Sequence, residues 1–414
     1  MSGAYRIKGA GRLTPARTAR FTFDGKIYQA LEGDTVASAL LANGVHLIGR
    51  SFKYHRPRGF LSAGPEEPNA LIDVSRDSMR KQPNVRATVQ DVFDGAIIAS
   101  QNRFPSLAFD ISAINDFLSP MFAAGFYYKT FMWPKAAWHR IYEPIIRRAA
   151  GLGKAPSEPD ADHYSGRYAH CDVLVAGGGV AGLTAALAAA KTGASVILVD
   201  ENAEVGGALR FDTRTVIDGL PGYEWAQKVL AELKSLPNVR VLTRTTAFGY
   251  YNHNFVALAE RVTDHLATPA RHQPRERLWQ VRAGKVVLAA GAIERHMVFA
   301  NNDRPGIMLA SAARIYLNHY GVSVGNNVGV YTAHDSAYET AFDLKNAAIV
   351  DCRENPDARL LDEARALGIE VLAGHSVYDT AGRLRVSSMT VGRNGGSNKR
   401  KIAIDALVVS AGWT

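Results

Sequence analysis

The clearest hydrophobic pattern lies in the middle of the chain. After Asp172, residues 173–176 form an apolar run followed by glycines, residues 181–191 are rich in alanine, and residues 196–199 form a second apolar run followed by Asp200. Short apolar runs bounded by glycine are typical of buried strands, and alanine favours helix. This order predicts a strand, a helix and a parallel strand, as in doubly wound α/β domains.

The turn between that strand and helix carries the motif Gly177-x-Gly179-x-x-Gly182. Such glycines allow a tight turn, close approach of the backbone to a pyrophosphate, and close packing of helix on strand. The phosphates then meet the free N–H groups at the start of the helix. The sequence therefore predicts an adenine dinucleotide site. Asp200 and its neighbour Glu201 favour NAD or FAD over NADP, because a carboxylate repels a 2′-phosphate.

Nearer the N-terminus the pattern has a shorter period. Residues 19–28 alternate between apolar and polar and predict two strands around an Asp24-Gly25 turn. Residues 35–43 predict a short helix that Gly44 closes. With further short strands up to Ile98, this region fits a ubiquitin-like or ferredoxin-like α+β module.

Residues 104–153 combine many aromatic side chains with prolines, which is too irregular for one amphipathic helix. We expect short helices that pack either on neighbouring domains or on a partner subunit. The aromatic residues are Phe117, Phe122, Phe126, Tyr127, Tyr128, Phe131, Trp133, Trp138 and Tyr142. Residues 155–166 are typical of a linker.

The second half of the chain predicts further α/β structure. Residues 239–242 fit a strand, and residues 275–281 with 285–289 fit a hairpin-like region. A second α/β unit starts near Asn326, but its turn at residues 332–338 has no glycine. Side chains there would obstruct a pyrophosphate, so we do not expect a second dinucleotide site.

These patterns predict an α/β protein with a small α+β module, divided into four parts. Residues 1–100 form a ferredoxin-like (β-grasp) domain, residues 101–168 an aromatic-rich helical connector, and residues 169–325 a Rossmann-like dinucleotide-binding domain. Residues 326–414 form a nested, degenerate second dinucleotide fold, incomplete at its C-terminus. We expect the chain to be the front part of a longer polypeptide.

Composition excludes several classes of function. The net charge is +9, but basic residues are scattered among acids and show no tract with interleaved aromatics, so we expect no nucleic-acid partner. Cys171 and Cys352 are the only cysteines, which leaves disulfide scaffolds, structural zinc and iron–sulfur clusters unsupported. No apolar run approaches the roughly 18 residues of a membrane span, and the N-terminus lacks a signal core. We therefore expect a cytoplasmic protein.

Longer motifs give the chain a family resemblance. It resembles the α subunits of heterotetrameric bacterial sarcosine oxidases over essentially its whole length. The motifs are Arg50–Gly59 (RSFKYHRPRG), Ala124–Pro134 (AGFYYKTFMWP), Thr246–Tyr251 (TAFGYY) and Phe299–Met308 (FANNDRPGIM). Related subunits of hydrogen cyanide synthase and of amino-acid and opine dehydrogenases bind a 2Fe-2S cluster through C-x4-C-x2-C. Ser62, Glu67 and Ala70 occupy that spacing here, so we expect a module without a cluster.

The resemblance implies a subunit of an oxidoreductase with α, β, γ and δ chains. Such enzymes oxidise sarcosine with oxygen to glycine, hydrogen peroxide and either formaldehyde or 5,10-methylenetetrahydrofolate. FAD and the amine site belong to the β subunit, FMN lies near the α/β boundary, and NAD binds the α subunit. Folate binds a C-terminal region that this sequence lacks.

The resemblance and the fingerprint together give the expected cofactor site. Gly177, Gly179 and Gly182 hold the pyrophosphate, and Asp200 the adenosine ribose. The full set of expected cofactor-binding residues is Gly177, Gly178, Gly179, Val180, Ala181, Gly182, Asp200, Glu201, Gly206, Gly207, Ala247, Ala290 and Gly291. We assign no metal ligand and no catalytic residue.

His55, His296 and His334 are candidates for proton transfer, but lone histidines are more often structural. Arg295 and Arg304 are candidates for contacts to phosphate or flavin, and equally for surface or interface ion pairs.

Two other functions remain open at this point. One is a FAD-dependent amine or amino-acid dehydrogenase subunit that passes electrons to a quinone, which the missing cluster cysteines disfavour. The other is a non-catalytic assembly module with a structural dinucleotide, which the lack of an evident acid/base constellation allows.

Overall fold

The computed structural model describes residues 3–121, 133–149, 155–345 and 347–414. The described residues form two compact units. Unit 1 contains residues 1–160 and 294–414, and unit 2 contains residues 161–293. Each unit is described here by itself.

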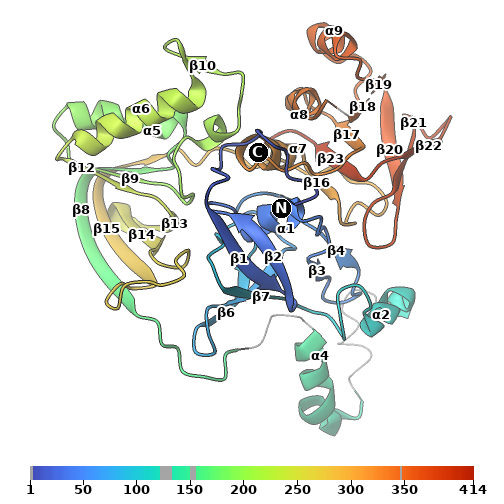
Figure 1. Cartoon of the computed structure of the whole chain (residues 1–414), viewed down its shortest axis with the longest axis horizontal. Coiled ribbons are helices and arrows are strands. Elements are labelled where there is room, and N and C mark those ends of the chain that lie inside the picture. The colour runs from blue at the N-terminus through green and yellow to red at the C-terminus, as the bar shows by residue number, and fades with distance from the viewer. Residues whose placement is uncertain (1–2, 122–132, 150–154, 346) are drawn as a thin grey trace. The chain divides into compact units, whose positions relative to one another are not determined.

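The N-terminal part of unit 1 is built on a mixed sheet of order β2-β1-β7-β5-β6 (Figure 1). Its strands are β1 (Thr18–Phe23), β2 (Lys26–Leu31), β5 (Leu71–Ser75), β6 (Lys81–Arg86) and β7 (Ala96–Ser100). Strands β1 and β2 are antiparallel and joined by Asp24 and Gly25, as predicted. Helix α1 (Val36–Ala42) starts at Thr35, whose side chain accepts from the Ser38 N–H, and its residues are buried. The small strands β3 (Gly49–Arg50) and β4 (Pro57–Arg58) form a separate pair. This arrangement confirms the predicted α+β module.

The C-terminal part of unit 1 contains a parallel sheet of order β16-β23-β17-β18-β19. Its strands are β16 (Ile307–Leu309), β17 (Val328–Thr332), β18 (Ala347–Asp351), β19 (Val371–Ala373) and β23 (Ala406–Ser410). The accompanying helices are α7 (Ala310–Arg314), η7 (Ile315–His319), α8 (Ser336–Leu344) and α9 (Ala358–Ala366). A smaller antiparallel sheet contains β20 (His375–Ala381), β21 (Ser388–Arg393) and β22 (Arg400–Ala403). The strand–helix alternation after Asn327 therefore matches the prediction.

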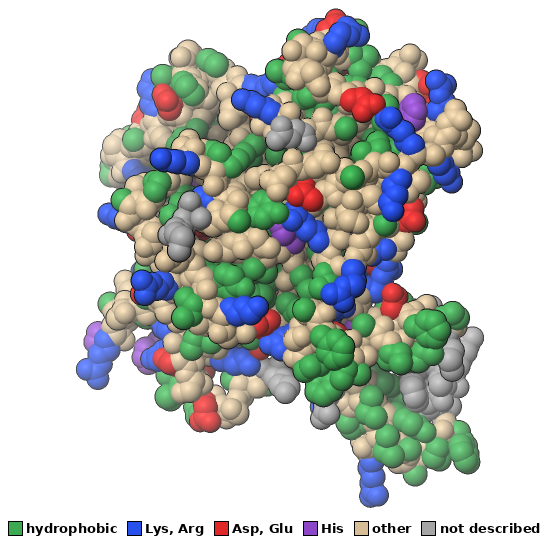
Figure 2. All heavy atoms as spheres, turned by 45° about the vertical axis from the view of Figure 1, so that its right-hand side comes forward, with side chains coloured by type: hydrophobic (Ala, Val, Ile, Leu, Met, Phe, Trp, Pro, Cys, Tyr) green, Lys and Arg blue, Asp and Glu red, His purple; other side chains and the backbone are tan. Residues whose placement is uncertain are grey.

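The aromatic segment that we expected to form short helices does so where it is described. These helices are η1 (Ile111–Ala113), α2 (Ile114–Phe117), η2 (Ser119–Met121), η3 (Lys135–Ala137), η4 (Trp138–Tyr142) and α4 (Glu143–Ala149). Hydrophobic side chains gather on this part of the surface (Figure 2), and Phe117 is 84% exposed. Phe122, Phe126, Tyr127, Tyr128 and Phe131 lie outside the described residues. What this segment packs against therefore stays a prediction.

Unit 2 is a sheet of order β12-β9-β8-β15-β14-β13, with two helices on one face (Figure 1). The strands are β8 (Tyr164–Ala176), β9 (Val196–Val199), β12 (Val239–Leu242), β13 (Thr245–Tyr251), β14 (Phe255–Arg261) and β15 (Glu276–Leu288). The helices are α5 (Val180–Lys191) and α6 (Gly222–Ser235). Strands β8, β9, β12 and β15 run parallel, as in a Rossmann-like domain. The remaining short elements are η5 (Gly207–Arg210), β10 (Val216–Ile217), β11 (Leu220–Pro221) and η6 (Asn252–Asn254).

Apolar packing on both faces holds the unit 2 sheet in place. Helices α5 and α6 pack on one face through a cluster that includes Leu183 and Val229. On the other face, Leu174, Leu258 and Trp279 belong to a second buried cluster. Burial of such side chains contributes about 25 cal/mol per Å² of apolar area, so both faces stabilise the strand ends where the dinucleotide motif lies.

Two details differ from the sequence-based expectations. The expected hairpin at residues 275–289 is wrong, because β15 is one continuous strand parallel to β8. Gly284 lies between the two expected segments and packs against β8, where an added Cβ would be 2.9 Å from the Asp172 carbonyl oxygen. In addition, residues 294–325, which we placed in the dinucleotide domain, group with unit 1. The reason is that β16 pairs with β23 of the C-terminal sheet.

Candidate functional site

The candidate site lies in unit 2, at the turn between β8 and α5. Gly177 has φ +106°, a backbone conformation that residues with a side chain rarely adopt. A Cβ at Gly177 would be 2.2 Å from the Ala289 carbonyl oxygen. Gly182 is equally constrained, since its Cβ would be 1.8 Å from the Gly177 carbonyl oxygen. These two glycines are therefore required by the turn and by helix–strand packing.

Gly179 differs from its neighbours because the protein itself leaves room for a side chain there. Its backbone has φ −74° and ψ −171°, and the nearest atom to an added Cβ is the Gly207 Cα, 3.9 Å away. Gly179 is also the N-cap of α5, which opens with Val180 and Ala181. A half-buried glycine with open space around its Cα, beside the first N–H groups of a helix, fits the close approach of a phosphate.

Asp200 follows β9 and points back to the glycine turn. Its Oδ2 accepts from the Gly178 N–H at 2.7 Å, and its Oδ1 accepts from the Asn202 N–H at 2.8 Å and from Asn202 Nδ2 at 3.0 Å. The residue is buried, with 6% of its surface exposed. Each carboxylate oxygen can accept more than one hydrogen bond, so Asp200 can hold both the turn and a ribose hydroxyl. Glu201, beside it, is half-buried.

A second glycine pair closes over the turn. The Gly206 N–H donates to the Gly178 carbonyl oxygen at 2.8 Å, and Gly207 lies against Gly179. A Cβ at Gly178 would meet both Asp200 Oδ2 and Val205 Cγ1 at 2.9 Å. The turn, the residue after β9 and the 205–207 segment thus form one continuous backbone surface.

The remaining expected residues lie at neighbouring strand ends. The Ala289 N–H donates to the Ala176 carbonyl oxygen at 2.8 Å, which brings Ala290 and Gly291 next to the turn. Ala247 on β13 lines a shallow pocket together with Ala176 and Leu288. All the expected cofactor-binding residues therefore lie in unit 2. Sequence reasoning missed Asn202, Val205 and Ala289, which support the site through contacts that only pairing of distant segments creates.

The candidate histidines have partners outside this site. His55 Nδ1 is 2.7 Å from Asp110 Oδ2, and both residues are buried in unit 1. His296 Nδ1 contacts the Met297 carbonyl oxygen, and His334 Nδ1 is 3.0 Å from Ser336 Oγ. Their hydrogen bonds stabilise local structure. Arg304 donates to the carbonyl oxygens of Thr380 and Gly382 and is likewise structural.

The second strand–turn–helix crossover, in unit 1, is filled by its own side chains. Tyr338 Oη donates to Asp351 Oδ2 at 2.9 Å at the end of β18. Arg353 Nη2 donates to the same carboxylate oxygen at 2.7 Å, and its Nη1 donates to Asp335 at 2.7 Å. Asp351 occupies the position that corresponds to Asp200. Its carboxylate is thus bound by tyrosine and arginine at the crossover without glycines.

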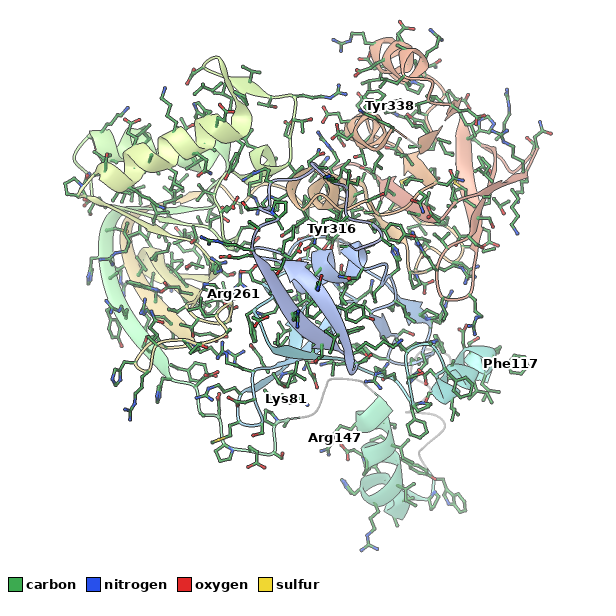
Figure 3. All side chains as sticks on the ribbon, in the orientation of Figure 1. Lys81, Phe117, Arg147, Arg261, Tyr316 and Tyr338 are labelled. Carbon is green, nitrogen blue, oxygen red and sulfur yellow. The ribbon has the colours of Figure 1, made fainter. Side chains whose placement is uncertain are left out.

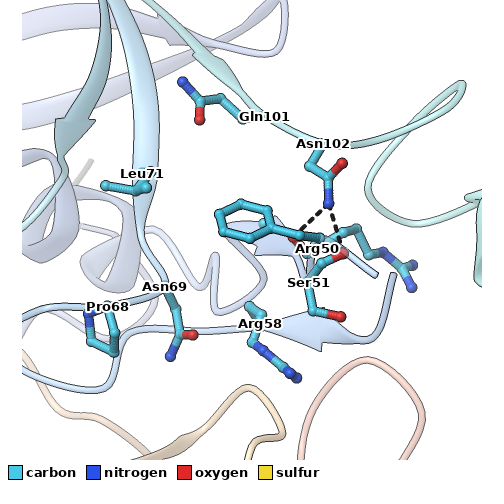
Figure 4. Close-up of a pocket in the computed structure, with 10 residues that line it drawn as sticks. Arg50, Ser51, Arg58, Pro68, Asn69, Leu71, Gln101 and Asn102 are labelled. Carbon is cyan, nitrogen blue, oxygen red and sulfur yellow. Dashed lines mark hydrogen bonds between the residues drawn. The ribbon is translucent and has the colours of Figure 1, made fainter. Parts of the chain in front are cut away.

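A separate pocket lies in the N-terminal module (Figure 4). Asn102 Nδ2 donates to the carbonyl oxygens of Arg50 and Ser51, at 3.1 and 2.6 Å. Pro68, Leu71 and the other lining residues are contributed by the same module. Among the residues described, no group of His, Cys, Asp and Glu side chains is arranged to hold a metal ion.

Comparison with known families divides the chain in agreement with its fold. Residues 16–103 match the 2Fe-2S iron-sulfur cluster binding domain family, and residues 172–299 match the FAD dependent oxidoreductase family. The N-terminal sheet and unit 2 thus belong to recognised types of domain. Within the described part of the chain, no helix is long and apolar enough to cross a membrane.

Relatives extend the similarity to the full chain. The sarcosine oxidase subunit alpha of Rhizobium meliloti (strain 1021) is 51% identical over 99% of this chain and 41% of its own length. That of Corynebacterium sp. (strain P-1) is 39% identical over 91% of this chain and 35% of its own length. The chain thus spans about two fifths of the length of the relatives that it matches.

A solved structure supports the fold. L-proline dehydrogenase from P. horikoshii has a TM-score of 0.61 at 19% identity, over 99% of this chain and 62% of that protein. This similarity shows that the ferredoxin-like module and the Rossmann-like domain occur together in one fold. The chain is therefore similar to sarcosine oxidase alpha subunits, and its residues 172–299 match the FAD dependent oxidoreductase family.

The residues of the N-terminal module do not fit the cluster that its family name implies. Cys171 and Cys352 are the only cysteines of the chain, and both lie outside residues 16–103. At the ligand spacing, Ser62, Glu67 and Ala70 supply no thiolate, and 2Fe-2S clusters are held by thiolates.

Proposed function

Because the chain is a homologue of sarcosine oxidase α subunits, we propose that unit 2 binds NAD within such an oxidase. The complex would oxidise sarcosine with oxygen to glycine, hydrogen peroxide and formaldehyde or 5,10-methylenetetrahydrofolate. The β subunit would hold FAD and the amine site, and FMN would lie near the α/β boundary. Beta, gamma and delta subunits would be the partners. Folate would be a further ligand of the complex.

One observation supports a dinucleotide more than any other, namely the free space at Gly179. Gly177 and Gly182 cannot accept a Cβ without a clash with the protein, whereas Gly179 can. The protein's own packing does not require glycine at that position. Close approach of a ligand to the backbone does.

The residues of the turn have distinct proposed roles. Gly179, Val180 and Ala181 would bind the pyrophosphate through backbone N–H groups and the positive end of α5. Asp200 would accept from the adenosine ribose, and its hydrogen bond to Gly178 would fix the turn beforehand. Bound NAD would supply a nicotinamide ring able to accept a hydride.

Cofactor extraction tests the identity of the dinucleotide. The chain is purified with its partner subunits, denatured, and the released molecule is identified by absorbance and mass. NAD in proportion to unit 2 supports the proposal. FAD bound to this chain alone, with no NAD, contradicts it.

Substitution of Gly179 tests the location of the site. Gly179→Ala should lower affinity for the dinucleotide at least about tenfold, because a methyl group takes the space of the pyrophosphate. The melting temperature should stay unchanged. Gly166→Ala is the matched control, since a Cβ at Gly166 in β8 meets no atom within 4 Å and one at Gly179 meets none closer than 3.9 Å. Equal affinity of the two variants would place the ligand elsewhere.

A second candidate is FAD in unit 2, as in an amine or amino-acid dehydrogenase subunit. The match of residues 172–299 to FAD dependent oxidoreductases favours it. Activity separates the two candidates, because the oxidase releases peroxide when sarcosine is added. A dehydrogenase instead reduces a quinone analogue without peroxide.

A further inference from the structure

The loop that would bind a cluster in related modules contains a buried carboxylate. Glu67 stands at the spacing of a cluster cysteine, and only 1% of its surface is exposed. Ser62 and Ala70, at the other two positions, are also buried. Because an isolated charge in the protein interior is highly unfavourable, specific partners must compensate the Glu67 carboxylate.

Four backbone N–H groups of the same loop converge on Glu67. Its Oε2 accepts from Leu61 and Ser62, both at 2.7 Å, and its Oε1 accepts from Asn69 at 2.7 Å and Ala70 at 3.2 Å. Burial raises the pKa of Glu67, and these four N–H groups act against that rise. Peptide dipoles therefore compensate the charge.

Converging backbone N–H groups form concave anion sites, and many phosphate and iron–sulfur sites have this construction. A thiolate-bound cluster is such an anion, and hydrogen bonds to its sulfurs tune it. We propose that the 61–70 loop is a preformed anion site filled by the Glu67 carboxylate of the chain itself. Glu67 thereby takes the place of the anionic cluster and preserves the loop without any metal.

The outer side of this loop joins the two sheets of unit 1. The Leu61 carbonyl oxygen accepts from the Leu309 N–H of β16 at 2.8 Å. The Ser62 carbonyl oxygen accepts from Tyr316 Oη at 2.8 Å, and Tyr316 (Figure 3) is fully buried. Thr88 Oγ1 donates to the Gly64 carbonyl oxygen at 2.6 Å. The Glu67 carboxylate thus orders a loop on which the packing of both sheets depends.

Chemical rescue tests the proposal in the full chain. Glu67→Ala removes the carboxylate and should lower the melting temperature by at least about 5 °C, because four N–H groups lose their acceptor. Sodium formate should restore at least half of this loss with a saturable dependence. Sodium pivalate, an anion too bulky for the vacated space, should not.

Glu66→Ala is the matched control, because Glu66 is the neighbouring carboxylate and is exposed. It should melt like the unsubstituted chain in every salt. The proposal is overturned if formate raises all the melting temperatures equally, or if Glu67→Ala melts like Glu66→Ala.

A milder variant decides the matter if Glu67→Ala does not fold. Glu67→Gln keeps the shape but turns an NH2 group toward one pair of N–H donors. Hydrogen exchange of the amides at residues 61–70 should become at least about tenfold faster than in Glu66→Gln. Unchanged exchange would refute the role of Glu67.

Iron reconstitution gives an independent readout. The full chain, incubated anaerobically with ferrous iron and sulfide and then desalted, should retain no iron above the buffer blank. Stoichiometric iron with a reduced 2Fe-2S signal would overturn the proposal. Neither result depends on which dinucleotide unit 2 binds.

Discussion

At the scale of single residues, the glycines of one motif occupy their positions for different physical reasons. Gly182 is fixed by the Gly177 carbonyl oxygen, which is part of the protein. Gly179 is explained only by a ligand, since the protein leaves space there. The sequence motif does not distinguish these positions. We expect substitution of Gly182 to lower stability and substitution of Gly179 to lower affinity for the dinucleotide.

Gly182→Ala should destabilise unit 2 by about 1–3 kcal/mol or more, because the new methyl group overlaps the Gly177 carbonyl oxygen. Urea denaturation of the variant measures this change. Gly166→Ala, at an open position, should be close to the unsubstituted chain. Equal midpoints for the two variants would show that α5 and β8 are further apart than described.

His46 makes unit 1 sensitive to acid. Burial, together with the charge of Arg385, lowers the pKa of His46 from 6.5 to about 3. The folded state therefore binds fewer protons than the unfolded state between pH 6.5 and 3, and stability falls as the pH decreases through this window. The loss attributable to His46 should reach about 2 kcal/mol at pH 5.

Replacement of His46 should remove this part of the pH dependence. His46→Phe keeps an aromatic ring beside Tyr5, whose ring centroid is 5.2 Å from that of His46. Denaturation at pH 7 and pH 5 should show a flatter dependence for His46→Phe than for the exposed control His272→Phe. Parallel pH profiles would mean that His46 is protonated in the folded chain.

At the scale of elements, the stability of a short helix depends on the residues that cap its ends. Helix α1 is only seven residues long, and isolated helices of that length are unstable. Burial of its side chains in the core of unit 1 stabilises it, together with the cap at Thr35. The cap therefore has a larger effect than in a long helix.

Thr35→Ala should lower the stability of unit 1 by about 1 kcal/mol, because the Ser38 N–H loses its acceptor at 3.2 Å. Chemical denaturation monitored by circular dichroism tests this. Thr14→Ala, an exposed threonine in the N-terminal segment, is the control and should change stability little. A smaller effect for Thr35→Ala than for Thr14→Ala would contradict the capping role.

At the scale of the whole molecule, two strand–turn–helix crossovers have a similar layout, but different groups line them. The crossover of unit 2 presents bare backbone, while that of unit 1 is filled by Tyr338, Asp351 and Arg353. Ligand binding should therefore be confined to unit 2.

Hydrogen exchange with NAD at 100 times its dissociation constant tests this confinement. Peptides covering residues 173–183 and 199–208 should be protected, with a limiting stabilisation of about 2.7 kcal/mol. The peptide covering residues 332–338 should exchange at the same rate with and without NAD. Protection of that peptide would indicate a second binding event.

The sequence predicted those elements whose signals are local. The glycine motif, the alternation before and after Asp24-Gly25, and the short helix at residues 35–43 each have signals within a few residues of the structure that they specify. Backbone conformation and nearest-neighbour packing determine such features, so a short window contains the information. The absence of thiolates at Ser62, Glu67 and Ala70 was likewise evident from the residues alone.

Tertiary structure decided what depends on distant partners. Residues 275–281 and 285–289 were expected to form a hairpin-like region, yet they form one strand, β15, because it pairs with β8 along its length. Strand β16 belongs to unit 1 because it pairs with β23. The role of the Glu67 carboxylate as the acceptor of four backbone N–H groups is visible only in the folded loop. The period of the hydrophobic pattern and the composition indicate whether a segment is a strand or a helix. They do not indicate which strand it pairs with, because pairing and burial involve segments far apart in the chain.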